Sequence, residues 1–139
     1  MTMTIEKLPD GPIILASFHE PMDWHQDATD MLDQLIEIRD QNIEGCPRYY
    51  AIIDLSSVKM GFSDVVIALG ALRRINVKRR PDMPANVSLV GSGGLIQLVS
   101  QAIGQQQYGE YQVQMYTSMD KALESIHADI ATWSVPSTS

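Results

Sequence analysis

Two short stretches of this chain have residue types and spacing suited to recognition or catalysis. Ser63 and Asp64 place a hydroxyl and a carboxylate directly before an apolar run, and Gly91 to Gly94 place glycines between two apolar segments. A serine before an apolar run is a typical helix N-cap, and an acid in the first turn interacts favourably with the helix dipole. Backbone amides of a glycine-rich turn before a helix can bind phosphate. The first pattern therefore predicts a charged helix start, and the second predicts a tight turn or an anion site.

The glycine-rich stretch departs from the common nucleotide-binding patterns. Ile96 stands where the dinucleotide fingerprint has its third glycine, and the apolar segment 113–116 is followed by Thr117 and Ser118, not by an acid that would hold a ribose. The sequence also lacks the Gly-Lys-Ser/Thr of a P-loop. Dinucleotide binding is therefore disfavoured. The four residues are interpreted as a tight turn, with an anion or another small ligand as the alternative: Gly91, Ser92, Gly93 and Gly94.

The histidines and the cysteine form no recognisable catalytic or metal-binding pattern. No two of His19, His25 and His127 share the four-residue spacing of a helical metal site. Cys46 lies in a predicted connector, and the sequence places no histidine base beside it. Ser92 superficially resembles the serine of a nucleophile elbow, but the chain is too short for the hydrolase fold that uses one. The sequence therefore predicts no enzymatic activity, no metal and no cofactor.

The elements around the hydroxyl and the carboxylate predict where these groups lie. Residues 50–55 form an apolar run rich in β-branched and aromatic residues, too brief for a helix, and the turn-forming Ser56 and Ser57 follow it. The apolar run 64–72 predicts a helix. The unit is therefore strand, loop, helix, with both polar groups at the carboxyl end of a central strand. Open α/β sheets usually place their functional residues there.

The N-terminal part of the chain predicts a hairpin and a long helix. Strands are expected at 4–8 and 13–18, because two short apolar runs flank the turn-forming pair Asp10-Gly11. Asp23 and Gln26 form a capping-box-like helix start. Apolar residues then recur at three- and four-residue intervals and predict one buried helix face: Ala28, Met31, Leu32, Leu35 and Ile38.

The C-terminal part continues the alternation of strands and helices. Strands are expected at 86–90 and 113–116, with helices at 95–103 and after Thr117 or Ser118. The order ββαβαβαβα implies an α/β fold with a mixed five-stranded sheet and four helices. Its strands are largely parallel, and an antiparallel hairpin forms one edge.

Composition and charge limit the class of protein. The chain has 139 residues, of which 45% are hydrophobic, and this favours a single domain over 1–133 with a flexible tail at 134–139. The net charge of −7 argues against nucleic acid as a partner. Five basic residues within 73–80 are interpreted as a solvated helix end. The single Cys46 and the lack of a long apolar segment predict a cytoplasmic protein with no membrane span.

The order of elements, and residues 53–58 followed by a serine-capped apolar helix, resemble the STAS domain. This is the fold of anti-sigma-factor antagonists and of the cytoplasmic part of sulphate transporters. The likeness covers most of the chain in topology and residues 50–72 at the level of motif. In that family the strand end is followed by an Asp-Ser-Ser-Gly-like signature, and a partner kinase phosphorylates the second serine. Alignment of the helices places Phe62, Ser63, Asp64 and Val65 on these four positions.

The resemblance implies a switch in which the carboxylate of Asp64 stands at the phosphoacceptor position. Asp64 either only stabilises the helix start or also keeps the surface permanently charged, in which case Ser63 should resist phosphorylation. The expected partner is a protein such as an anti-sigma-factor-like kinase, and homodimer formation is left open. The predicted partner-binding residues are Asp54, Ser56, Ser57, Met60, Phe62, Ser63, Asp64 and Val65. The alternative is a lipid or nucleotide carrier or sensor with a pocket near Gly91 to Gly94.

Overall fold

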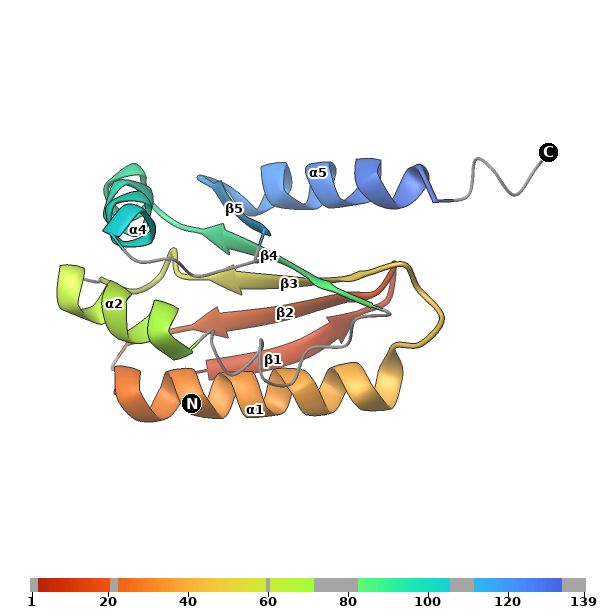
Figure 1. Cartoon of the computed structure of the whole chain (residues 1–139), viewed down its shortest axis with the longest axis horizontal. Helices are drawn as coiled ribbons and strands as arrows, with labels where there is room; N and C mark the ends of the chain where they lie inside the picture. The colour runs from red at the N-terminus through yellow and green to blue at the C-terminus, as the bar shows by residue number, and fades with distance from the viewer. Residues whose placement is uncertain (1–2, 21–22, 60, 72–82, 106–111, 134–139) are drawn as a thin grey trace.

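A computed structural model describes residues 3–20, 23–59, 61–71, 83–105 and 112–133 (Figure 1). Within these residues the elements follow the order ββαβαβαβα, which confirms the predicted alternation. The elements are β1 Met3–Leu8, β2 Ile13–Phe18, α1 Trp24–Asn42, β3 Tyr49–Asp54, α2 Phe62–Ala71, β4 Ala85–Val90, α4 Gly93–Gln105, β5 Gln112–Tyr116 and α5 Met119–Ala131.

The five strands form one mixed sheet in the order β1-β2-β3-β4-β5. β1 and β2 pair antiparallel, with Leu8 opposite Ile13, so the predicted hairpin forms one edge of the sheet. The other neighbours pair parallel, because a helix crosses over between each of them. The predicted central strand β3 lies in the middle of the sheet, where Ile52 pairs with Leu15 and Ser88.

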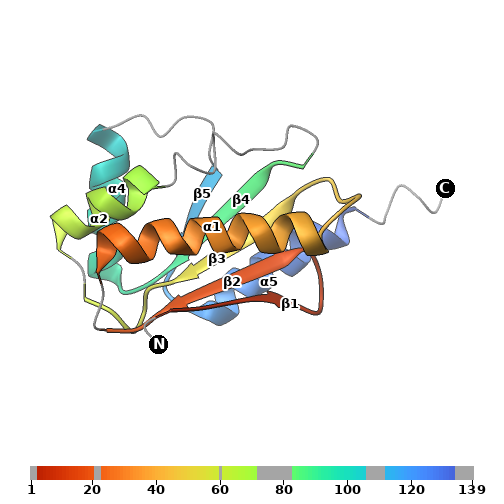
Figure 2. The same cartoon turned by 90° about the horizontal axis from the view of Figure 1, so that it is seen from below.

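The described helices cover the two faces of the sheet unequally. Side chains of α1, α2 and α4 share one buried cluster with alternate strand residues such as Ala51 and Ile53. On the opposite face, α5 packs Ala122 and Ile126 against Tyr50 and Ile52 (Figures 1 and 2). Because helices lie on both faces, β3 is buried almost throughout, which explains its nearly continuous apolar sequence.

The long helix α1 has the predicted N-cap, Asp23, but a different residue completes the capping box. Asp23 is the N-cap, and its side chain accepts a hydrogen bond from the Gln26 backbone N–H at 3.4 Å. The reciprocal acceptor for the Asp23 N–H is the carboxylate of Asp27, at 2.9 Å, and not the side chain of Gln26. The side-chain amide of Gln26 instead donates a hydrogen bond to the carboxylate of Asp30, about one helical turn further along α1. The predicted apolar face is confirmed: Ala28, Met31, Leu32 and Leu35 are buried and Ile38 is half-buried.

Several sequence predictions lie outside the described residues. These are the basic cluster at 73–80, the tail at 134–139 and Met60. Within the described part of the chain, none of the helices combines the length and the apolar character needed to span a bilayer.

Candidate functional site

The carboxyl end of β3 and the start of α2 lie at one edge of the sheet, where β2 and β4 also end (Figure 1). Asp54 is the last residue of β3, and its Oδ1 accepts hydrogen bonds from the backbone N–H and the hydroxyl of Ser56, at 3.0 and 2.6 Å. This arrangement stabilises the turn that follows the strand. Ser56 and Ser57 are exposed and Asp54 is half-buried. The structure therefore brings the predicted residues at the strand end together at the surface.

The helix start differs from the prediction that Ser63 is the N-cap. The Val65 N–H donates to the Gly61 carbonyl at 3.2 Å, so the helical hydrogen bonds begin at Gly61 and Ser63 lies within the first turn. Asp64 Oδ2 accepts from the Gly61 backbone N–H at 3.0 Å, as the acidic residue of a capping box does. The prediction for Ser63 was wrong because the carboxylate, and not the hydroxyl, satisfies the amide at the helix start.

The side chains in the first turn of α2 differ in their exposure to solvent. Phe62 is 38% exposed, and among the side chains that the structure describes it is the one large hydrophobic group that lies exposed. Ser63 is also exposed, and Asp64 is half-buried. Val65, by contrast, is only 1% exposed and packs in the core cluster under α2. Its predicted contact with a partner is therefore wrong, because a buried side chain cannot form the centre of an interface.

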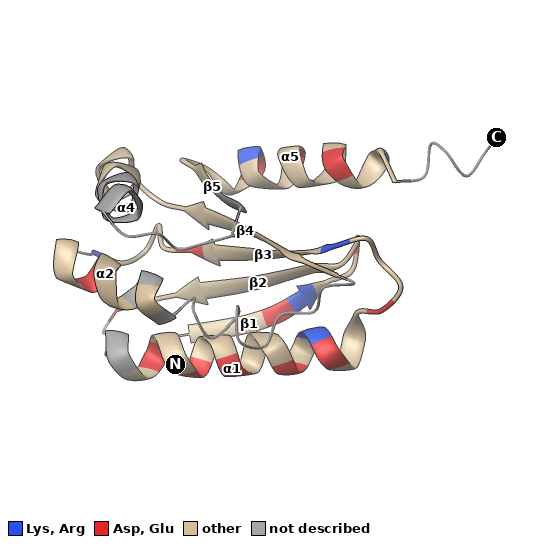
Figure 3. Cartoon of the chain, viewed as in Figure 1, with Lys and Arg blue, Asp and Glu red and all other residues tan. Residues whose placement is uncertain are grey.

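Several polar and charged residues lie at the same end of the sheet as Phe62. Glu20, just after β2, accepts a hydrogen bond from the Lys59 backbone N–H at 2.9 Å, which ties the loop before α2 to the end of β2. Figure 3 shows acidic residues at the end of β3, at the start of α2 and along α1. We name the exposed and half-buried residues of this edge the docking surface: Glu20, Asp54, Ser56, Ser57, Lys59, Phe62, Ser63 and Asp64.

Replacing Asp64 by alanine should lower the free energy of unfolding by about 0.5–2 kcal/mol, because the Gly61 N–H loses its acceptor. Asp64→Asn should lower the free energy of unfolding by less. The side-chain oxygen of asparagine can still accept the hydrogen bond, so only the favourable charge at the helix start is lost. Urea denaturation followed by circular dichroism measures both. Ser57→Ala, at an exposed site, is the control and should stay within about 0.5 kcal/mol of the wild type. Equal effects of Asp64→Ala and Ser57→Ala would contradict the capping role.

The turn from Gly91 to Gly94 is explained by helix capping and close packing. Ser92 Oγ accepts from the Leu95 N–H at 3.1 Å, so one amide of the α4 start is already paired within the chain. The Gly91 N–H donates to the Tyr116 carbonyl at 3.1 Å. A Cβ on Gly91 would lie 2.4 Å from Leu95 Cδ2, which favours glycine at this position. These contacts give the turn residues a structural role.

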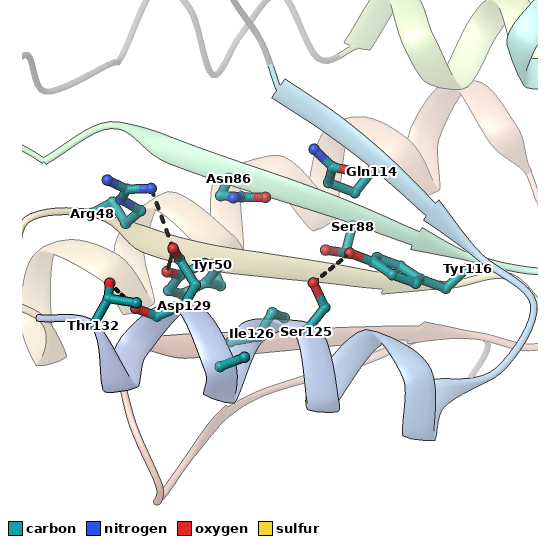
Figure 4. Close-up of a pocket in the computed structure, with 11 residues that line it drawn as sticks. Arg48, Tyr50, Asn86, Ser88, Gln114, Tyr116, Ser125, Ile126, Asp129 and Thr132 are labelled. Atoms are coloured by element: carbon teal, nitrogen blue, oxygen red, sulfur yellow. Dashed lines mark hydrogen bonds and ion pairs between the residues drawn. The ribbon is translucent and has the colours of Figure 1, made fainter.

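A second site, which the sequence did not predict, lies between α5 and the sheet. This α5 pocket has a volume of about 480 Å³ (Figure 4). Its lining includes Arg48, Tyr50, Asn86, Ser88, Gln114 and Asp129, and does not include Gly91 to Gly94. One signal was present in the sequence: β4 and β5 carry polar side chains at alternate positions, which all strands place on one face of a sheet.

One end of the α5 pocket is organised by Asp129. The Tyr50 hydroxyl donates to Asp129 Oδ2, and Arg48 Nη1 lies 3.3 Å from the same oxygen. The Tyr50 ring stacks on Trp133, with 5.9 Å between the ring centroids. Burial raises the pKa of Tyr50, and the hydrogen bond to Asp129 and its negative charge raise it further. Tyr50 is therefore a neutral hydrogen-bond donor over the whole physiological pH range.

The raised pKa of Tyr50 predicts a loss of stability in alkaline solution. Because the folded state disfavours the phenolate, this contribution is fully present below the ordinary tyrosine pKa of about 10 and is lost as the pH rises toward the raised pKa. We expect the Tyr50→Phe variant to lose less stability than the wild type between about pH 10 and pH 11. Urea denaturation at each pH measures this difference. Parallel losses in both proteins would contradict the assigned cause.

His127 and Cys46 make contacts within the protein. His127 Nε2 lies 2.8 Å from Asp10 Oδ2, which joins α5 to the β1–β2 turn. Cys46 Sγ lies 3.6 Å from the Glu44 carbonyl oxygen. Within the described residues, no group of three or more histidine, cysteine or acidic side chains is arranged to hold a metal ion.

No family model, no curated protein and no solved structure matches this chain. The resemblance to STAS domains therefore rests on the order of elements and on the motif of residues 50–72.

Proposed function

We propose that this protein is a non-enzymatic regulatory module that binds a protein partner through the docking surface, as an anti-sigma-factor antagonist does. The observation that carries the proposal is the exposure of Phe62 among hydroxyl and carboxylate groups. Protein interfaces typically place a few aromatic residues at their centre and surround them with polar side chains. A single aromatic residue with Ser63 and Asp64 beside it provides such a centre on the first turn of α2.

Charge indicates the chemistry of the partner. Glu20, Asp54 and Asp64 lie on the docking surface, and Lys59 balances only part of their charge. The chain as a whole carries a net charge of −7. We therefore expect the partner to offer an apolar pocket for Phe62, with basic residues around it. Electrostatic attraction of this kind mainly raises the association rate and weakens as salt is added.

The docking surface is held in place before any partner binds. Asp54 fixes the turn at Ser56, Asp64 caps α2 at Gly61, and Glu20 holds the loop through the Lys59 N–H. Ordered surface groups lower the entropy cost of association. The supporting hydrogen bonds therefore favour a surface that binds without refolding.

The carboxylate of Asp64 distinguishes this surface from a phosphorylated switch. In this proposal Asp64 keeps the start of α2 negatively charged at all times, so binding does not depend on a kinase. The neighbouring hydroxyl of Ser63 is exposed but stays unmodified, because a phosphate dianion would lie next to the Asp64 charge. Mass spectrometry showing stoichiometric phosphate on Ser63 in protein isolated from its native host would contradict this part of the proposal.

Affinity capture with three variants tests the proposal. Phe62→Ser removes the apolar centre, and Asp64→Arg reverses the charge on the same surface. Glu124→Arg makes the same charge change at an exposed position of α5, on the other face of the sheet, and is the matched control. We expect a protein that is captured by the wild type and by Glu124→Arg but not by the other two. Calorimetry with the purified partner should then show an affinity loss of about 30-fold or more for Phe62→Ser.

Circular dichroism must first show that all three variants are folded. Equal capture by the wild type and by both docking-surface variants would overturn the proposal, and so would a similar loss with Glu124→Arg.

A further inference from the structure

We propose that the α5 pocket binds a small, uncharged molecule rich in hydroxyl groups, of the size of a monosaccharide. The volume of about 480 Å³ lies within the range of about 300–1,000 Å³ that is typical of small-molecule sites. The pocket opens on the face of the sheet that α5 covers, whereas α1, α2 and α4 pack on the other face.

The floor of the pocket consists of polar side chains from neighbouring strands. Ser88 of β4 pairs with Gln114 of β5, and Asn86 lies two residues before Ser88 on the same face. Figure 4 shows these side chains between Arg48 and Asp129 at one end and Tyr116 and Ser125 at the other. The Tyr116 hydroxyl donates to Ser125 Oγ at 2.9 Å and so links β5 to α5 at that end. The floor is therefore polar at a place where a parallel sheet normally carries apolar side chains.

The side chains of the floor have hydrogen-bonding capacity that the protein itself does not use. Asn86, Ser88 and Gln114 make no side-chain hydrogen bond to any other described residue, and of the three Ser88 is almost fully buried, Asn86 is half-buried and Gln114 is exposed. Arg48 Nε is also buried, and it has no hydrogen-bond partner among the residues that the structure describes. Buried polar groups are normally hydrogen-bonded, since leaving them unpaired is unfavourable. This applies to Ser88 and to Arg48 Nε, and the more accessible amides of Asn86 and Gln114 lie beside them on the same lining, so a ligand that forms several hydrogen bonds would suit the pocket.

The charges around the pocket favour an uncharged ligand. Arg48 pairs with Asp129 at 3.3 Å, and the other polar groups that line the cavity are amides and hydroxyls. An anion would compete with Asp129 for Arg48, and a cation would compete with Arg48 for Asp129. The amides of Asn86 and Gln114 each offer donors and an acceptor, which complements hydroxyl groups that also donate and accept. A sugar or another polyol meets both requirements.

Titration of the 15N-labelled protein with sugars, followed by NMR, tests the proposal. The neutral probes are glucose, N-acetylglucosamine and myo-inositol, and the charged counterparts are glucuronate and glucosamine. We expect saturable shifts of the side-chain amide signals of Asn86 and Gln114 with at least one neutral probe. Glucuronate and glucosamine should each bind at least tenfold more weakly than the active neutral probe, because a charged group disturbs the pairing of Arg48 with Asp129.

Two variants in the α5 pocket and one control variant test whether the sugar binds in this pocket. Gln114→Ala and Asn86→Ala should each weaken binding of the active probe about tenfold, as expected for a lost hydrogen-bonding side chain. Gln34→Ala, at an exposed position of α1, should leave the affinity unchanged. If one pocket variant loses its dispersed amide spectrum, the other still reports on the site.

Two outcomes would overturn the inference. One is the lack of a saturable shift with all three neutral probes, and the other is tighter binding of glucuronate or glucosamine than of their neutral counterparts. The inference does not depend on the proposed partner, because Gln114→Ala leaves every residue of the docking surface unchanged. Loss of sugar binding and loss of partner capture are therefore separate results.

Discussion

Leu35→Ala is expected to lower the free energy of unfolding by about 2–5 kcal/mol, the range for a leucine in a close-packed core. Leu35 has 0% exposure and lies where α1 packs on the sheet. Alanine would remove apolar surface and leave a cavity, because the neighbouring helix and strands can collapse only partly. A domain of this size is typically stable by only about 5–15 kcal/mol, so the loss would be a large share of the total.

Urea denaturation followed by circular dichroism measures this change. Gln34→Ala is the matched control, since it changes the adjacent residue of the same helix at an exposed position. It should stay within about 0.5 kcal/mol of the wild type. A loss below about 1 kcal/mol for Leu35→Ala would mean that α1 does not pack on the sheet as described.

Tyr50→Ala should have an effect of similar size from the other face of the sheet, about 3–5 kcal/mol as for other large core side chains. Tyr50 is 1% exposed, stacks on Trp133 and donates its hydroxyl proton to Asp129. Tyr50→Phe keeps the ring in place and removes only the hydroxyl, so it should cost about 0.5–1.5 kcal/mol. The difference between the two variants separates the packing of the ring from the hydrogen bond.

A double-mutant cycle with Asp129→Ala tests the hydrogen bond directly. If Tyr50 and Asp129 interact, the effects of Tyr50→Phe and Asp129→Ala should not add, and the coupling free energy should be at least about 0.5 kcal/mol. Strict additivity would contradict the contact. The same cycle made with Ser57→Ala, on the docking surface, should show additive effects because the two positions belong to different sites.

At the docking surface, local sequence patterns predicted some features correctly and others wrongly. The apolar run of β3 and the turn-forming Ser56 correctly predicted a strand end with an exposed turn. The position of the cap was predicted two residues too late, because sequence spacing does not reveal which side chain reaches the free amide of Gly61. The assignment of Val65 to partner binding was wrong for a different reason. The rotation of a helix about its axis depends on what it packs against, and α2 packs against both α1 and α4.

The α/β alternation, the hairpin at the edge and the buried face of α1 could all be predicted from local sequence patterns. Each of these depends on periodicity and turn chemistry within a few residues, which a single chain displays directly. The α5 pocket, by contrast, became visible only when the elements were placed together in space. Arg48 and Asp129 are 81 residues apart, and Ser88 meets Gln114 only through the register of β4 and β5. Contacts of this kind arise when separate elements pack together, so no local pattern contains them.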